Sequence, residues 1–270
     1  MPELPEVETT LSGIRPLLQG HVIRQVRVRN PALRWPVTAA VQQVCGQQVH
    51  RLSRRAKYLL IECETGGLMC HLGMSGSLRI CQDGDPPRLH DHFDLVLDSA
   101  YCVRFHDPRR FGALLWWDPP FQAHELLREL GPEPLSQEFD GKYLWQRARQ
   151  LRTPVKNFIM NGKVVVGVGN IYASEALFMA GIHPCRAAGR IALSRYQGLA
   201  AVIKDVLQRA IRRGGTTLRD FVNAAGEPGY FAQDLLVYDR EGKACFQCQT
   251  PIRRTVIGQR SSYYCPRCQR

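Results

Sequence analysis

The sequence predicts an α+β protein with several domains: a β-rich N-terminal part, a helical middle and a metal-bound hairpin at the C-terminal end. Three observations predict it. Short strand-like runs separated by turn residues fill 22–117, apolar residues recur at helical spacing from about 122 to 213, and two Cys-x2-Cys pairs occupy the last residues. We expect domains at 1–130, 131–235 and 236–270. With 44% hydrophobic residues among 270, the chain can bury a sizeable core.

The charge balance points to a polyanionic partner. The formal net charge is +12 and the sequence pI is about 9.5, which favours nucleic acid first and an anionic membrane surface second. No long basic amphipathic helix, no signal segment and no apolar run near the ~18 residues of a membrane span is evident. We therefore expect a soluble cytoplasmic protein, and nothing indicates more than a monomer.

The first helix is expected over 5–18, where Val7, Leu11, Ile14 and Leu18 have helical spacing. It follows directly on a short N-terminal segment of unusual composition and would anchor that segment against a core.

That segment is Met1-Pro2-Glu3-Leu4-Pro5-Glu6. If Met1 is removed, Pro2 carries a secondary α-amine, and an α-amine with a pKa of roughly 7.7–8.0 is partly unprotonated near neutrality. Such an amine can attack an aldehyde or a sugar C1′ and form an iminium, with Glu3 beside it for proton transfer. The hexapeptide is equally well explained as a plain helix start, with Pro5 at the first helical position and Glu6 near the positive end of the helix dipole.

The β-rich part is predicted to form a sandwich or flattened barrel, because several short strands are separated by turn residues. The expected strands are 26–28, 58–62, 68–72, 93–97, 103–105 and 113–117.

Three segments of this part carry candidate functional residues. The basic run 51–57 leads into a strand and ends at Lys57; a solvated charge run is the ordinary explanation. Glycine-rich 71–79 carries Met74, and 107–112 carries Arg109 and Phe111. Met74 and Phe111 are each more often core residues. Two loops that offer apolar tips and a guanidinium would also suit a wedge that enters duplex DNA and fills the gap left by an extruded base.

In the helical middle, helices are expected over 123–130, over 143–151 and from 194 to a stop at Gly214. A Gly167-Val168-Gly169 turn feeds another helix with Asn170 as its N-cap, which is either a phosphate site or a simple helix corner. The polar stretch 214–230 predicts a loop, in its functional form a lid.

The four cysteines at the end have the spacing of a zinc site. Cys245 and Cys248, then Cys265 and Cys268, form two Cys-x2-Cys pairs separated by sixteen residues. Four thiolates leave no open position for water, so one structural Zn²⁺ is predicted; disulfides are the alternative. Runs 252–257 and 261–264 predict a hairpin with Arg260 near its tip. The six other cysteines are predicted to be buried free thiols: Cys45, Cys63, Cys70, Cys81, Cys102 and Cys185.

Together these motifs resemble the formamidopyrimidine-DNA glycosylase family, the bacterial 8-oxoguanine-DNA glycosylases that are also AP lyases. The resemblance runs nearly end to end and rests on residues 2–8, 54–59, 71–76, 107–112 and 166–175 and on the zinc finger with Gln259-Arg260. It implies an N-terminal two-layer β-sandwich with flanking helices, a second domain with a helix–two-turn–helix and a C-terminal zinc-finger β-hairpin. It further implies double-stranded DNA containing an oxidised purine or an abasic site, bound in the cleft between the domains.

The resemblance also implies residue roles. Pro2 is the Schiff-base nucleophile, Glu3 protonates the opening sugar, and Lys57 and Arg260 act at phosphates and as proton donors for β- and δ-elimination. Met74, Arg109 and Phe111 fill the void, with Arg109 facing the orphaned cytosine. The other DNA or base contacts are His90, Arg152, Lys156 and Asn170; the motif around Tyr238 is too loose to include it. Asn161-Gly162 departs from the family's usual acidic residue and amide, which bears on the lesion side only.

Two alternatives remain at this point. An endonuclease VIII-like glycosylase for oxidised pyrimidines would use the same amine chemistry, although Met74, Arg109, Phe111 and Leu4 favour the purine-lesion branch. A non-catalytic zinc-dependent DNA-binding protein would fit the charge and the zinc finger equally well, and only Pro2, Glu3 and Lys57 speak against it.

Overall fold

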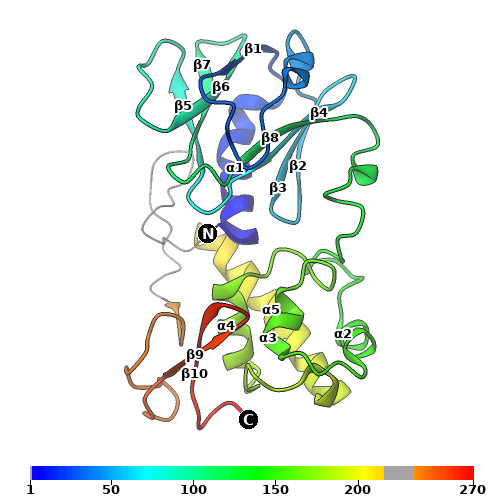
Figure 1. Cartoon of the computed structure of the whole chain (residues 1–270), viewed down its shortest axis with the longest axis vertical. Helices are drawn as coiled ribbons and strands as arrows, with labels where there is room; N and C mark the ends of the chain where they lie inside the picture. Colours follow the sequence, from blue (N-terminus) through cyan, green and yellow to red (C-terminus); the bar gives the residue numbers. More distant parts are fainter. Residues whose placement is uncertain (1, 216–233) are drawn as a thin grey trace. The chain divides into compact units, whose positions relative to one another are not determined.

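The structure, a computed structural model, describes residues 2–215 and 234–270 (Figure 1). The chain divides into two compact units, the first formed by 1–128 with 211–232 and the second by 129–210 with 233–270. The expected boundaries at 130/131 and 235/236 remain predictions. The lid expected over 214–230 lies outside the described residues except for Gly214 and Gly215, and Met1 lies outside them as well.

The first unit contains two four-stranded antiparallel sheets. In the first sheet the strand order is β1-β6-β7-β5, with β1 (Ile23–Val28), β5 (Ser77–Gln82), β6 (Asp91–Leu97) and β7 (Tyr101–His106). In the second sheet it is β2-β3-β4-β8, with β2 (Arg51–Arg55), β3 (Tyr58–Glu62), β4 (Gly67–His71) and β8 (Ala113–Trp117).

Helix α1 (Leu4–Leu18) contacts strands of both sheets, β2 and β3 in one and β5 in the other (blue in Figure 1). Its apolar face is fully buried because Val7, Leu11, Ile14 and Leu18 lie on one side of the helix. These side chains join residues from both sheets in one core cluster. The two-layer sandwich with a flanking helix is therefore confirmed, and the core fixes the start of α1, where Pro2 and Glu3 lie.

Two strands were not predicted. β2 is the basic run itself, since Arg51 to Arg55 pair residue by residue with Glu62 to Tyr58 of β3. Only Leu52 of this strand is fully buried, so it has no clear apolar alternation. β5 follows the glycine-rich turn and is paired with β7 from Ser77 to Gln82. Lys57 is therefore in the turn of the β2–β3 hairpin rather than at the entry of a lone strand.

Helices form the body of the second unit: α2 (Gly141–Ala148), α3 (Val155–Met160), α4 (Asn170–Met179) and α5 (Leu193–Arg212), which continues two residues beyond it. Short 3-10 turns occupy Ala39–Val44 and Phe121–Ala123 in the first unit and Ala188–Arg190 in the second. The long helix from 194 is confirmed. The helix expected over 123–130 is wrong: the 3-10 turn Phe121–Ala123 is followed by turns, although Leu127 is buried there.

Two further details differ in the helical region. The N-cap of α4 is Gly169, and Asn170 is its first helical residue, whose side chain binds Lys156 and the Ser261 carbonyl. α3 was not predicted, because a six-residue helix after Pro154 is too short to show periodicity.

The C-terminal hairpin pairs β9 (Arg253–Ile257) with β10 (Arg260–Tyr264). Its two-residue turn, Gly258-Gln259, has positive φ at both positions, as a type I′ turn requires. Arg260 is thus the first residue of β10. Phe178, Val237 and Ile252 pack with Cys245 and Cys265 in a small core of their own.

Within the described ranges, no helix combines the length and the apolar character needed to cross a membrane.

Candidate active site

The N-terminal segment is held by a reciprocal capping box at the start of α1. The Glu3 side chain accepts from the backbone of the first turn, and the Glu3 N–H donates to Glu6 Oε2 at 2.8 Å. Glu3 and Glu6 are each only 2% exposed, and Pro2 is buried. The helix start therefore fixes both carboxylates close in sequence to Pro2, as the plain structural explanation requires. The catalytic roles of Pro2 and Glu3 stay predictions.

Lys57 follows Ala56, which has a positive φ of 56°, in the β2–β3 turn. The next residue, Tyr58, begins β3 and is paired with His71 of β4. Burial, Lys57 and Arg34 together lower the pKa of His71 to about 4. His71 is therefore a neutral ring at pH 7, and its Nδ1 accepts the Gly73 N–H at 2.9 Å.

Met74, Arg109 and Phe111 come from two loops that are in backbone contact. A Cβ built on Gly73, whose φ is +67°, would lie 2.4 Å from the carbonyl carbon of Phe111, so only glycine allows this approach. Met74 is 37% and Phe111 43% exposed, and the Arg109 guanidinium lies 5.1 Å from the Phe111 ring centroid. The structure thus brings the three predicted residues together as an exposed apolar and cationic group.

His90 has a positive φ of 74°, and its carbonyl oxygen accepts the Asp107 N–H at 3.0 Å. Its ring lies edge-on to His106, with the centroids 6.1 Å apart. The neighbouring Asp91 carboxylate binds His106 Nδ1 at 2.9 Å and Arg79 at 2.5 Å. The His90 backbone is therefore bound to Asp107, the first residue of the loop 107–112 that carries Arg109.

In the second unit, Lys156 and Asn170 form a cluster with the hairpin. Lys156 is 0% exposed and donates to Asn170 Oδ1 at 2.7 Å, Ser262 Oγ at 2.6 Å and the Ser261 carbonyl at 3.2 Å. Asn170 Nδ2 donates to the same Ser261 carbonyl at 3.0 Å. The cluster joins the start of α4 to β10, the strand that begins with Arg260.

The remaining predicted contacts of this unit, Arg152 and Arg260, are exposed. Asn161 and Lys163, at the departure from the family pattern, are exposed too, and Lys163 pairs with Glu129.

A missed residue of the second unit is Glu175. Its buried carboxylate accepts the backbone N–H groups of Leu236, Val237 and Tyr238 at 2.8, 3.0 and 2.8 Å. Burial raises the pKa of Glu175, and the three hydrogen bonds, which lower it, offset this only in part. The sequence signal for Glu175 was its position at the end of the 166–175 motif. Its hydrogen bonds fix residues 236–238, the segment that leads into the zinc finger.

The four Sγ atoms of Cys245, Cys248, Cys265 and Cys268 all lie within 4.8 Å of one another. The Cys245–Cys268 and Cys248–Cys265 pairs are 4.0 and 3.4 Å apart. Zn–S bonds of about 2.3 Å in a tetrahedron separate the sulfurs by about 3.8 Å, so the donor set fits zinc.

All ten cysteines lie in the described ranges and none is in a disulfide. Of the six others only Cys70 and Cys102 are buried; Cys185 is exposed, so the expectation that all six are buried is wrong.

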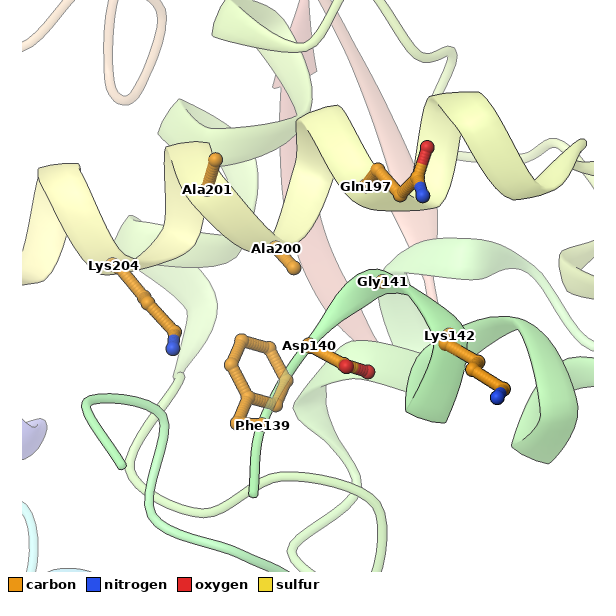
Figure 2. A pocket seen from close by; sticks show the side chains of 8 residues that line it. All are labelled: Phe139, Asp140, Gly141, Lys142, Gln197, Ala200, Ala201 and Lys204. Carbon is orange, nitrogen blue, oxygen red and sulfur yellow. The ribbon is translucent and has the colours of Figure 1, made fainter. Parts of the chain in front are cut away.

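A cavity of about 340 Å³ in the second unit lies apart from the predicted residues (Figure 2). The Lys204 side chain extends along it toward Phe139 in Figure 2, and the Lys204 ammonium donates to the Ser136 carbonyl at 2.8 Å. Its lining consists of Phe139, Asp140, Gly141, Lys142, Gln197, Ala200, Ala201 and Lys204.

Three family models match the chain in order. Residues 1–114 match the formamidopyrimidine-DNA glycosylase N-terminal domain, 130–222 the formamidopyrimidine-DNA glycosylase H2TH domain, and 242–270 the zinc finger found in FPG and IleRS.

Curated relatives match over the full length. Formamidopyrimidine-DNA glycosylases from Methylococcus capsulatus and Alcanivorax borkumensis are 58% and 59% identical to the chain, each over all of both chains. Among solved structures, the MutM (Fpg) protein of Thermus thermophilus has 39% identity and a TM-score of 0.89, covering 99% of this chain and 98% of its own. A complex of Lactococcus lactis Fpg with DNA containing an abasic site has 29% identity and a TM-score of 0.91, covering 99% of both chains.

Proposed function

The chain belongs to the formamidopyrimidine-DNA glycosylase family, and from this premise we propose how its own residues act. It is a base-excision repair enzyme, a DNA glycosylase and AP lyase that removes oxidised purines such as 8-oxoguanine and formamidopyrimidines. Its partner is double-stranded DNA with such a lesion or an abasic site, and it carries one structural zinc.

Pro2 is the nucleophile in our proposal. Its neutral ring nitrogen attacks C1′ of the lesion nucleotide and the bond from C1′ to the base breaks, while the proton of the nitrogen leaves with the base. The nitrogen lone pair then breaks the bond from C1′ to the ring oxygen, so that an iminium joins Pro2 to the opened sugar. Glu3 protonates the sugar oxygen as the ring opens. The observation that supports this assignment is the capping box, which fixes Glu3, the residue next to Pro2, and Glu6 at the start of α1.

The iminium then acidifies the C2′ proton. Loss of that proton expels the 3′-phosphate, and a second elimination expels the 5′-phosphate. Lys57 and Arg260 stabilise these phosphates as they leave and supply protons. Both cations are held near the start of a strand, Lys57 in the turn before β3 and Arg260 as the first residue of β10.

A base inside a duplex cannot be reached, so the lesion must be extruded at a cost of a few kcal/mol. Met74, Arg109 and Phe111 fill the space that it leaves, and their joint exposure on two touching loops supports this role. His90, Arg152 and Asn170 contact DNA. For Lys156, full burial favours an indirect part, in which its ammonium orients Asn170 and β10.

The test is reductive trapping on a duplex with 8-oxoguanine opposite cytosine. Borohydride should reduce the iminium to a stable covalent adduct, and the adduct should be lost in Pro2→Gly. Pro5→Ala, which removes a proline of the same segment and keeps the Pro2 amine, should still form it. An adduct of equal yield in Pro2→Gly would refute the assignment, as would an intact Met1 in active enzyme by mass spectrometry.

The same assay separates the alternatives. Adduct on oxidised pyrimidines alone would indicate the endonuclease VIII-like specificity, and tight binding without adduct would indicate a DNA-binding protein without catalysis.

We also place the enzyme in the bacterial cytoplasm on the nucleoid, supported by its net charge of +12 and its bacterial relatives. A fluorescent fusion that failed to follow the DNA stain would contradict this placement.

A further inference from the structure

We propose that Asp107 is a positioning residue that joins the Met74 loop (73–76) and the Arg109 loop (107–112) into one rigid wedge. Through Ser75, it makes the two loops enter DNA as a unit when the lesion base is extruded. This inference rests on the proposed function and concerns the extrusion step rather than the chemistry at Pro2.

The Asp107 carboxylate makes contacts in both loops. Its Oδ1 accepts the Ser75 hydroxyl at 2.6 Å and the Arg109 N–H at 3.2 Å, and its Oδ2 accepts the Gly112 N–H at 2.8 Å. Asp107 is 0% exposed and Ser75 is 4% exposed. A buried carboxylate with three such donors is held firmly, since hydrogen bonds to charged groups are shorter and stronger than neutral ones.

The backbone of Asp107 extends the same connection to a third segment. Its N–H donates to the His90 carbonyl at 3.0 Å, and its carbonyl accepts from His92 Nε2 at 2.7 Å. Thus one residue touches the segment that carries His90, the loop that carries Met74 and the loop that carries Arg109 and Phe111.

The two loops alternate buried polar contacts with exposed tips. Ser75 is buried beside exposed Met74, and Asp107 is buried two and four residues before exposed Arg109 and Phe111. Gly73 lies against the Phe111 backbone with no room for a side chain. The exposed tips are therefore held by a rigid buried part of the two loops, although each tip projects into solvent.

This rigidity matters for the extrusion step. Ordering mobile loops during binding costs conformational entropy, and preorganisation removes that cost. The wedge must be complete at the moment when the base leaves the stack, because the void is then unfilled. A preformed abasic site has no base to extrude, so strand cleavage there should depend much less on the joint between the loops.

Ser75→Ala tests the joint, because it removes only the hydroxyl donor between the loops. We expect single-turnover excision of 8-oxoguanine opposite cytosine to fall about tenfold, which corresponds to ~1.4 kcal/mol, a typical loss for a hydrogen bond to a charged group. Cleavage at a preformed abasic site, measured with the same preparation, should stay within about twofold of the parent enzyme. Asp107→Asn should lose more of the 8-oxoguanine excision rate, and its cleavage at a preformed abasic site should likewise be much less affected.

Ser53→Ala is the matched control, since it removes a hydroxyl-to-carboxylate hydrogen bond of 2.7 Å to Glu62 in the same unit. It should leave both rates unchanged. Equal losses of excision and abasic-site cleavage in Ser75→Ala would show a merely structural role and overturn the inference. Unchanged excision in folded Ser75→Ala would overturn it as well. Pro2→Gly loses both activities if the proposed chemistry holds, so the two failures can be told apart.

Discussion

His71 illustrates how one side chain links stability to pH. Its pKa is lowered to about 4, first by burial and then by the cations Lys57 and Arg34. In the unfolded chain the ring titrates near ~6.5. Below that value the unfolded state therefore binds a proton that the folded state refuses. The stabilising effect of the neutral ring is complete above pH 6.5 and is lost as the pH falls toward 4.

We predict that this ring contributes about 2–3 kcal/mol to the loss of unfolding free energy between pH 7 and pH 4.5. His71→Gln should therefore lose less stability than the parent over this interval, measured by urea denaturation at both pH values. His50→Gln, at a half-exposed histidine of the same unit, should follow the parent. Identical pH dependence of His71→Gln and the parent would contradict the cause assigned to the shift.

At the scale of elements, apolar alternation and helical spacing were enough to predict most strands, α1 and α5. β2 could not be predicted this way, because a strand of mostly arginine and serine is fixed by its pairing with β3. Over 123–130 the opposite error occurred: the apolar residues have helical spacing, but the segment forms turns. The zinc site was predictable because metal geometry imposes the cysteine spacing.

The site itself was less predictable. Motifs in the local sequence indicated Pro2, Glu3 and the loop residues, whose roles are proposals. The burial of Lys156 was not predictable, because its partners Ser261 and Ser262 lie more than a hundred residues away. Asp107 was hidden for a similar reason, since its partner Ser75 is 32 positions before it.

We predict that Lys156→Met weakens binding to abasic-site DNA about tenfold, roughly the loss of one hydrogen bond to a charged group, but leaves the salt dependence of binding unchanged. An ammonium that acts through Asn170 and β10 neutralises no phosphate. The variant should therefore release as many counterions from the DNA on binding as the parent does, so the salt dependence is the same. Titrations at several salt concentrations measure both quantities.

Lys204→Met is the control, because Lys204 also donates to a backbone carbonyl in this unit, at 2.8 Å, beside the Phe139 ring. It should bind like the parent. A salt slope that falls by about 0.9 in Lys156→Met would instead show direct phosphate contact.

For the whole molecule, the net charge of +12 attracts the protein to DNA from a distance, but the salt dependence of binding is set by the cations that contact phosphate. Only cations that contact phosphate contribute to the slope of log K against log salt, each by about 0.9. Arg152→Gln and Arg260→Gln should therefore each reduce the slope by about 0.9 on abasic-site DNA. Arg27→Gln removes an equal charge from an arginine that pairs with Asp83 at 3.1 Å, and it should leave the slope unchanged. Equal slopes for all three variants would contradict the proposed contacts.

The buried ammonium of Lys156 also bears on how the protein is made. Its carbonyl and hydroxyl partners, Ser261 and Ser262, are translated 105 and 106 residues later. At about 5–20 residues per second, a ribosome needs roughly 5–20 s to supply them. Until then the ammonium must stay hydrated, so the second unit cannot reach its final packing while the nascent chain lacks its last strand. A chaperone that shields this unit during translation would therefore have to remain bound until the last strand has been made.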